Sequence, residues 1–157
     1  MKIRPMKAAD YAEVDRLMQQ VHQLHLQARP DLFIPLEHPY SREKFLQMIS
    51  SPDWICLAAE QNEPLDGQLD GICFVSMRNH TCMVDTRSAY LEDLCVDSRC
   101  RHQGIGQALY RHAEQAAREK GAIRFDLMVW PFNEGAIRFY ESLGFSTQRL
   151  MLEKKLP

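Results

Sequence analysis

The segment Arg101-His102-Gln103-Gly104-Ile105-Gly106 joins one basic side chain to two glycines at a point where a strand would give way to a helix. The apolar run 90–96 before it is typical of a buried strand, and apolar residues recur at helical spacing after it. Glycines let backbone approach a ligand closely and permit positive φ. The first amides of a helix have no partners within it. The segment therefore predicts a cradle for a pyrophosphate, with Arg101 supplying positive charge.

A second segment, Asn133 to Tyr140, is followed by Leu143-Gly144-Phe145. In order and spacing, the two segments resemble the R/Q-x-x-G-x-G/A acyl-CoA signature and the N-x-x-A-x-x-F-Y ending of the GNAT superfamily of N-acetyltransferases. The resemblance is specific from about residue 88 to the C-terminus and general before it. The run Tyr-Leu-Glu-Asp-Leu at 90–94, with the position of Tyr140, is most similar to the spermidine/spermine N-acetyltransferase branch.

The resemblance implies acetyl-CoA as the acyl donor. It implies that backbone amides of the glycine segment hold the pyrophosphate, and that the pantetheine arm lies like a missing strand between two splayed parallel strands. Asn133 would contact the arm while capping the last helix, and Ala136 would permit close approach. The expected cofactor-binding residues are Leu94, Cys95, Val96, Arg101, His102, Gln103, Gly104, Ile105, Gly106, Asn133 and Ala136.

Direct aminolysis of a thioester needs a base and an acid. An alkylamine with a pKa of ~10.4 is almost entirely protonated at neutral pH, so the enzyme must take a proton from it. We expect Glu92 to be this base, directly or through water, with Asp93 as the open alternative. We expect Tyr140 to protonate the departing thiolate. The alternative for Tyr140 is a core position beside Phe139 and Phe145.

The elements that would position these residues follow from periodicity. Strict alternation along the strand 90–96 would place Glu92, Leu94 and Val96 on one face and Leu91, Asp93 and Cys95 on the other. Strands are expected at 2–5, 54–60, 71–77, 90–96, 123–130 and 145–156, and helices after Asp10 as N-cap, around 45–49 after Ser41 as cap, over 106–120 closed by Gly121, and from Asn133 to near Gly144.

This order predicts an α/β fold, with a central twisted mixed sheet of six to seven strands and helices on both faces. It also predicts a single domain over residues 1–157. The acceptor-side elements would occupy about 6–52 and the acetyl-CoA-binding core about 88–145. The loop 61–70 is expected to connect a hairpin.

The composition narrows the possible partners. A net charge of −2 argues against nucleic acid, and no apolar run approaches the ~20 residues that cross a bilayer. The N-terminus lacks the apolar core of a signal peptide, so a cytoplasmic location is the default expectation. The five cysteines are expected to be reduced thiols. His22 and His25 lack a third ligand nearby in sequence, so no metal is expected.

The acceptor is expected to be a small amine held by the first two helices and the loops 28–40 and 81–88. Those loops contain Asp31, Glu37 and Asp85, but arginines as well. Polyamines or other small amines come first, and peptide or protein amines are the alternative within the same class. The alternative from another class is a non-catalytic acyl-CoA-binding regulatory module. The resemblance alone implies a homodimer.

Overall fold

The computed structural model describes residues 1–60, 67–82, 84 and 86–156, so most of the predicted loop 61–70, as well as Asp85, lies outside the described residues. The elements run in the order β1 (Lys2–Pro5), α1 (Tyr11–Ala28), α2 (Arg42–Ser50), β2 (Trp54–Glu60), β3 (Gly71–Asn79), β4 (Arg87–Val96), α3 (Ile105–Glu119), β5 (Arg124–Leu127) and α4 (Glu134–Ser142). Short 3₁₀ turns occupy Ala8–Asp10 and Ser98–Cys100.

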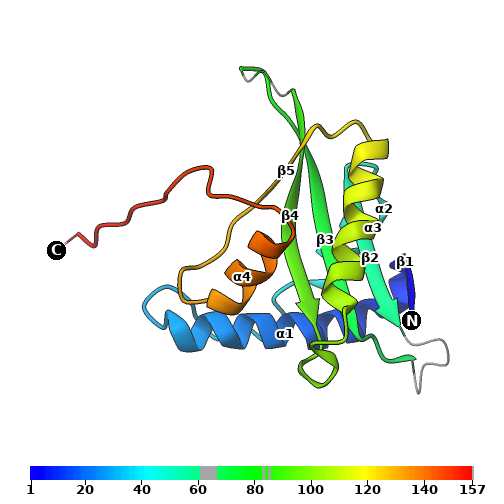
Figure 1. Cartoon of the computed structure of the whole chain (residues 1–157). Coiled ribbons are helices and arrows are strands. Elements are labelled where there is room, and N and C mark those ends of the chain that lie inside the picture. Colours follow the sequence, from blue (N-terminus) through cyan, green and yellow to red (C-terminus); the bar gives the residue numbers. More distant parts are fainter. Residues whose placement is uncertain (61–66, 83, 85, 157) are drawn as a thin grey trace.

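The sheet has the order β1-β2-β3-β4-β5 (Figure 1). Neighbouring strands are antiparallel from β1 to β4, while β4 and β5 are parallel. The parallel pair is joined through α3, which makes it a β-α-β unit. The fold is therefore the expected mixed α/β sheet, with five strands in the described residues instead of six to seven.

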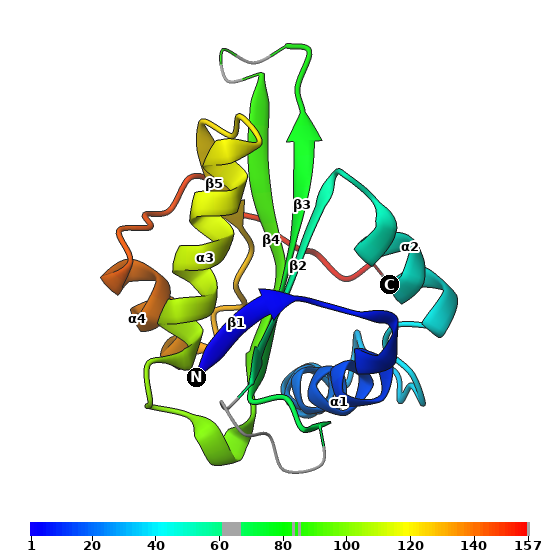
Figure 2. The ribbon, with the colours of Figure 1, turned by 90° about the vertical axis from the view of Figure 1, so that its right-hand side faces the viewer.

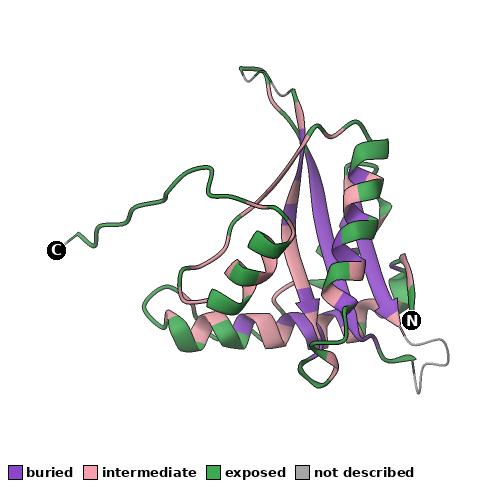
Figure 3. Cartoon of the chain, viewed as in Figure 1, coloured by how far each residue is buried: buried purple, intermediate pink, exposed green. Residues whose placement is uncertain are grey.

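Helices cover both faces of the sheet (Figure 2). On one face, Leu17 of α1 and Phe45 of α2 pack with Phe74 of β3. On the other face, Leu109 of α3 packs with Val75 of β3 and Leu91 of β4. The purple interior in Figure 3 follows β2, β3 and the inner side of α3. Successive side chains of β3 point alternately into the two layers, as expected for a strand that is covered on both faces.

Two predicted boundaries are confirmed by the contacts that set them. Ser41 caps α2, since its hydroxyl accepts a hydrogen bond from the Lys44 amide at 3.2 Å. Gly121 follows α3 with φ of 83°, a left-handed conformation that favours glycine at the end of a helix. Asp10 occupies the N-cap position of α1 as expected, but its side chain makes no cap hydrogen bond to that helix. Its carboxylate instead accepts from the Lys7 amide and pairs with Arg4.

Two strand predictions also need correction. β5 covers only Arg124–Leu127 rather than 123–130. The expected last strand, 145–156, is extended chain that pairs with no strand of the described sheet. Residues 128–130 alternate as a strand would, but β5 parts from β4 after Leu127 although β4 continues to Val96. Residues 145–156 have no strand partner in the described sheet.

β4 contains a bulge that changes which way its acidic residues face. Phe74 lies opposite Asp93 and Val75 lies opposite Leu91, so Glu92 is one residue too many for the ladder. The bulge overturns the expectation of strict alternation. Beyond it, Asp93 bonds to the α1–α2 connection and Cys95 reaches the Leu17 carbonyl of α1.

The other side chains of β4 confirm that the bulge changes which residues face each layer. Leu94 and Val96 pack in the α3 layer, the layer that also holds Leu91. Glu92 contacts Ser76, which alternates with Phe74 and so lies on the α1–α2 face of the sheet. Glu92 and Asp93 therefore share one face, and Leu94 and Val96 occupy the other.

Candidate active site and cofactor cradle

The two parallel strands part in the middle of the molecule. Their register ends where Leu91 of β4 meets Leu127 of β5, yet β4 continues to Val96. Within the described sheet, residues 92–96 therefore have a strand partner on the β3 side only. Backbone groups along this edge can bond to an extended ligand as a strand would. Leu94, Cys95 and Val96, expected beside the pantetheine arm, all lie on it.

The glycine segment forms the turn that starts α3. Gly104 stands before the first helical residue, Ile105, with φ of 80°, and a side chain added there would meet nothing within 4 Å. Residues 101–104 are exposed while Ile105 is buried. The turn thus presents the partnerless first amides of α3 to solvent beside Arg101, and such a helix N-terminus favours an anion.

The two glycines serve different purposes. Only Gly104 adopts the positive φ expected of both. A Cβ at Gly106 would stand 3.5 Å from Phe139 of α4 and 3.5 Å from Val96, so this glycine lets the start of α3 pack against α4 and the end of β4. His102 is also left-handed, with φ of 62°. Sequence reasoning missed this, because histidine carries no strong signal for that conformation.

α4 begins after β5, at the end of the connection 128–133. Asn133 caps the helix as expected, and its side-chain oxygen accepts a hydrogen bond from the Ala136 amide at 3.2 Å. Asn133 and Ala136 are half-buried. Both expected cofactor contacts in this segment are thus at the helix end that follows β5.

Tyr140 lies on α4 in the α3 layer of the core. Its ring centroid is 5.2 Å from that of Phe139 and 5.7 Å from that of Phe145, so the packing role considered for it is present. Burial raises the pKa of Tyr140 well above its ordinary value, and the nearby Cys73 and Asp93 raise it further. A phenol in this state keeps its proton at neutral pH, as a general acid must.

Glu92 is held by two partners on β3. The Ser76 hydroxyl donates to its carboxylate at 2.5 Å, and the Arg78 guanidinium pairs with the same oxygen at 3.0 Å. Arg78 also stacks on the ring of Tyr90, 3.4 Å from the ring centroid. These contacts fix the direction of the Glu92 carboxylate.

Asp93 has its own partner, which sequence reasoning missed. The hydroxyl of Tyr40, in the connection between α1 and α2, donates to its carboxylate at 2.5 Å. Burial raises the pKa of Asp93, and this hydrogen bond opposes the rise. The Lys44 ammonium lies 4.5 Å from the Tyr40 ring centroid. No local pattern marks Tyr40, because its partner is 53 residues away in the chain.

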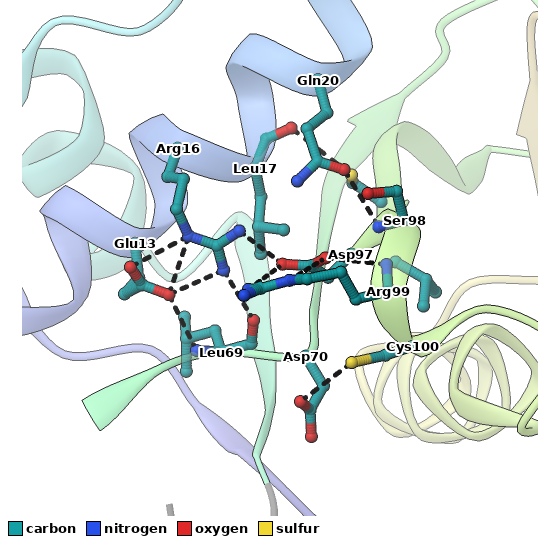
Figure 4. A network of polar contacts seen from close by, with 12 residues as sticks. Glu13, Arg16, Leu17, Gln20, Leu69, Asp70, Asp97, Ser98, Arg99 and Cys100 are labelled. Atoms are coloured by element: carbon teal, nitrogen blue, oxygen red, sulfur yellow. Dashed lines mark hydrogen bonds and ion pairs between the residues drawn. The ribbon is translucent and has the colours of Figure 1, made fainter. Parts of the chain in front are cut away.

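A network of ion pairs fastens the turn before the cradle to α1 (Figure 4). Asp97 follows β4 directly, and its side chain is 1% exposed. Its carboxylate pairs with Arg16 of α1 and with Arg99 at 2.8 Å, and it accepts from the Arg99 amide at 3.0 Å. Arg16 also pairs with Glu13 and donates to the Leu69 carbonyl. These donors hold the pKa of Asp97 far below its usual range.

The histidines considered as a metal site make other contacts. His22 bonds to the Ile34 carbonyl at 2.8 Å, and His25 stacks on Phe33 with 5.2 Å between ring centroids. In the part of the chain that the structure describes, no group of three or more His, Cys, Asp or Glu side chains could hold a metal ion. The same part contains no helix that could span a membrane.

An open edge between parallel strands, followed by a helix N-terminus built on a left-handed glycine, is an arrangement suited to an acyl carrier with a pyrophosphate. Residues 18–145 match the Acetyltransferase (GNAT) family. The chain belongs to this family.

Two curated relatives differ in the acceptor that their names state. Thialysine N-epsilon-acetyltransferase of Sus scrofa is 34% identical over 97 residues, which cover 60% of this chain and 56% of that protein. N-alpha-acetyltransferase 30 of Homo sapiens is 32% identical over 110 residues, covering 70% of this chain and 29% of that protein. The chain thus spans just over half the length of the first of these curated relatives and less of the second.

Among solved structures, a mutant of the BH1408 protein from Bacillus halodurans superposes on the chain with a TM-score of 0.91. The two are 26% identical, and the match covers 100% of each chain. The similarity therefore extends over the whole fold, including elements before the glycine segment.

Proposed function

We propose that the chain transfers an acetyl group from acetyl-CoA to a primary amine by direct attack in a ternary complex. The observation that carries the proposal is the parting of β4 and β5 after Leu91 beside the exposed turn at Gly104. Membership of the GNAT acetyltransferase family supports the same reaction. In this proposal residues 1–157 act as one domain.

The cofactor would bind along the open edge and over the turn. Backbone groups of Leu94 and Val96 would bond to the pantetheine arm and polarise the thioester carbonyl. The amides from 102 to 106 and the Arg101 side chain would hold the pyrophosphate. Asn133 would contact the pantetheine arm from the side of the opening that lies away from β4.

The proton transfers are assigned to two side chains from opposite layers. Glu92 would accept the amine proton, directly or through water, because Ser76 and Arg78 fix its carboxylate on the α1–α2 face. Tyr140 would give its proton to the departing thiolate from the α3 layer. Asp93, on the same face as Glu92, is the alternative base.

The proposed acceptor is a small cationic amine. Glu92 and Asp93 bring two carboxylates to one face of the bulge, which favours a positively charged substrate. Of the acidic residues expected to help, Asp31 is paired with Arg29 at 2.9 Å, and Glu37 is almost fully exposed. Relatives that act on thialysine support a small amine, and a relative named as an N-alpha-acetyltransferase makes peptide amines the second candidate.

The test is acetyl-CoA turnover by purified protein against polyamines, amino acids, peptides and aminoglycosides, with products identified by mass. Amine-dependent product is expected with small amines. Binding of acetyl-CoA without product from any amine would favour a non-catalytic acyl-CoA-binding module instead. In the active protein, we expect Tyr140→Phe and Glu92→Gln to lower kcat with acetyl-CoA affinity retained. Full kcat in both variants from pH 6 to 9 would contradict the assigned roles, and loss in Asp93→Asn alone would identify Asp93 as the base.

A further inference from the structure

Four ring side chains that the proposed chemistry does not use meet at the C-terminal end of α1, and we call them the aromatic cluster: His25, Phe33, Trp130 and Phe132. His25 belongs to the last turn of α1, and Phe33 to the connection that follows it. The other two come from the connection 128–133, which Figure 1 shows descending from β5 to the end of α1. The cluster therefore ties the chain after β5 to α1.

Trp130 is at the centre of the cluster, because its ring meets each of the others. Its centroid lies 5.9 Å from that of Phe33, 5.8 Å from that of Phe132 and 6.5 Å from that of His25. All three separations fall in the range of roughly 4.5–7 Å at which aromatic rings attract each other. The guanidinium carbon of Arg29 also lies 5.5 Å from the Trp130 centroid, within reach of a cation–π interaction.

The α1 side of the cluster is fixed by contacts of its own. The Phe33 amide donates to the Arg29 carbonyl at 3.0 Å. One residue on, the Ile34 carbonyl bonds to the buried His22 ring at 2.8 Å. Arg29 is in turn paired with Asp31 at 2.9 Å. Trp130 therefore packs on a surface that is held in place without it.

The cluster explains why the two parallel strands part where they do. Pairing of β4 with β5 ends at Leu91 and Leu127, although β4 continues to Val96. Residues 128–130 contain no glycine or proline and keep the alternation of a strand. Further ladder bonds would replace bonds to water and gain little, whereas leaving the cluster would expose the Trp130 ring. Packing of Trp130 therefore outweighs further pairing.

Trp130 also sets the position of Asn133, the proposed contact of the pantetheine arm on this side. The Asn133 amide donates to the Trp130 carbonyl at 2.9 Å, which closes the turn 130–133. The Asn133 side chain then caps α4 through the Ala136 amide. A displaced Trp130 would thus move Asn133 and the start of α4 together.

We propose that Trp130 is a positioning residue for the acyl donor: anchored on the end of α1, it holds residues 128–133 away from β4 and so keeps the edge 92–96 open for the pantetheine arm. The inference rests on the proposed function, which assigns this edge to acetyl-CoA. Trp130 acts through two other groups, the unpaired backbone of β4 and the side chain of Asn133.

The test compares hydrogen exchange at the amides of residues 92–96 in the free protein with binding of coenzyme A alone, measured by calorimetry. Trp130→Ala should free residues 128–130 to pair with β4, so exchange at 92–96 should slow. The affinity for coenzyme A should fall by about tenfold, the equivalent of roughly one hydrogen bond. Trp130→Phe keeps a ring that can pack on Phe33 and should stay close to the wild type in both measurements.

Two further variants separate this role from general packing. Phe33→Ala removes the anchor on the α1 side and leaves Trp130 in the chain. It should produce the same two changes, so the test does not depend on Trp130→Ala being able to fold. Trp54→Ala is the matched control, since Trp54 is the other tryptophan of the chain and packs at the start of β2 against the α1–α2 layer. It should lower the urea midpoint while leaving exchange at 92–96 and coenzyme A binding unchanged.

Each other outcome overturns the proposal. Unchanged exchange at 92–96 in both Trp130→Ala and Phe33→Ala means that β4 and the chain after β5 stay apart without the cluster. Slower exchange with unchanged coenzyme A binding means that the open edge does not hold the cofactor. The same changes in Trp54→Ala mean that loss of stability alone produces them. Failure of the wild type to acetylate any amine would refute the proposed function instead, since neither measurement needs acetyl transfer.

Discussion

Replacing Asp97 by Asn should weaken both the fold and the grip on the cofactor. The substitution keeps the size of the side chain but removes its charge. The amide oxygen of Asn can still accept from the Arg99 amide, whereas the amide nitrogen would turn a donor toward the Arg16 guanidinium. The carboxylate is 1% exposed, so water cannot replace the lost acceptor.

The expected loss follows from these contacts. Removing one member of a buried ion pair costs about 3–5 kcal/mol when the other charge is left without compensation. Arg16 keeps its pair with Glu13, and Arg99 is 61% exposed, so the lower end, about 3 kcal/mol, applies. For a chain of 157 residues, that corresponds to a fall in Tm of about 6–12 °C.

Urea unfolding and thermal melting measure this loss directly. Asp31→Asn is the matched control, because it removes the same charge from an exposed pair with Arg29 and should leave the urea midpoint close to that of the wild type. Because Asp97 sets the turn that leads to Arg101, the KM for acetyl-CoA should rise more than kcat falls. If Asp97→Asn unfolds at the wild-type midpoint, the network does not stabilise the fold and the reasoning is refuted.

Three further predictions follow from individual contacts. The pKa of Asp97 is lower in the folded protein than in the unfolded chain, so its carboxylate stabilises the fold above the unfolded pKa of about 3.9, and this stabilisation is lost as pH falls below that value. Acid should therefore narrow the difference in unfolding free energy between wild type and Asp97→Asn. A difference that does not change with pH down to 2.5 would contradict this. Gly104→Ala should cost about 1–2 kcal/mol in urea unfolding, because alanine is strained at φ of 80°, and should weaken acetyl-CoA binding by calorimetry, while Gly135→Ala, at a helical position with open space, should do neither. Tyr40→Phe removes a hydrogen bond that stabilises the Asp93 carboxylate, so the pKa of Asp93 should rise further. If Asp93 controls the acid limb of the pH–rate profile, that limb should move to higher pH. A limb that stays in place would show that Asp93 does not control it.

Local patterns predicted most of the scaffold because its signals are local. The Ser41 cap, the glycine after α3 and the Asn133 cap each depend on residues within three or four positions, and the structure confirms them. The expected strand at 145–156 was wrong for the opposite reason. A strand exists only through its neighbour, and the residue types at 145–156 do not say which strand supplies one.

The acidic pair of β4 shows a second limit of local reasoning. Strict alternation predicted that Glu92 and Asp93 lie on opposite faces of the sheet. The prediction was wrong because β4 contains a bulge, and a bulge is set by the pairing of β4 with β3 rather than by the sequence of β4 alone. Sequence analysis missed Tyr40 and Arg16 because their partners are distant in the chain. Tyr40 lies 53 residues from Asp93, and Arg16 lies 81 residues from Asp97. Their roles depend on the packing of α1 and its following loop on the sheet, which periodicity alone does not determine.

The bulge also organises the proposed chemistry. With strict alternation, one of the two carboxylates would enter the α3 layer, beside Tyr140 and the apolar core. The extra residue instead turns both toward the α1–α2 face, where Tyr40 and Ser76 receive them. Beyond it, the backbone of Leu94 and Val96 still runs along the open edge. An acyl group held on that edge would have an acidic acceptor side on one face and a protonated phenol on the other, so an amine could enter and a thiolate leave in opposite directions. A single irregularity in one strand thereby separates the proposed base from the proposed acid.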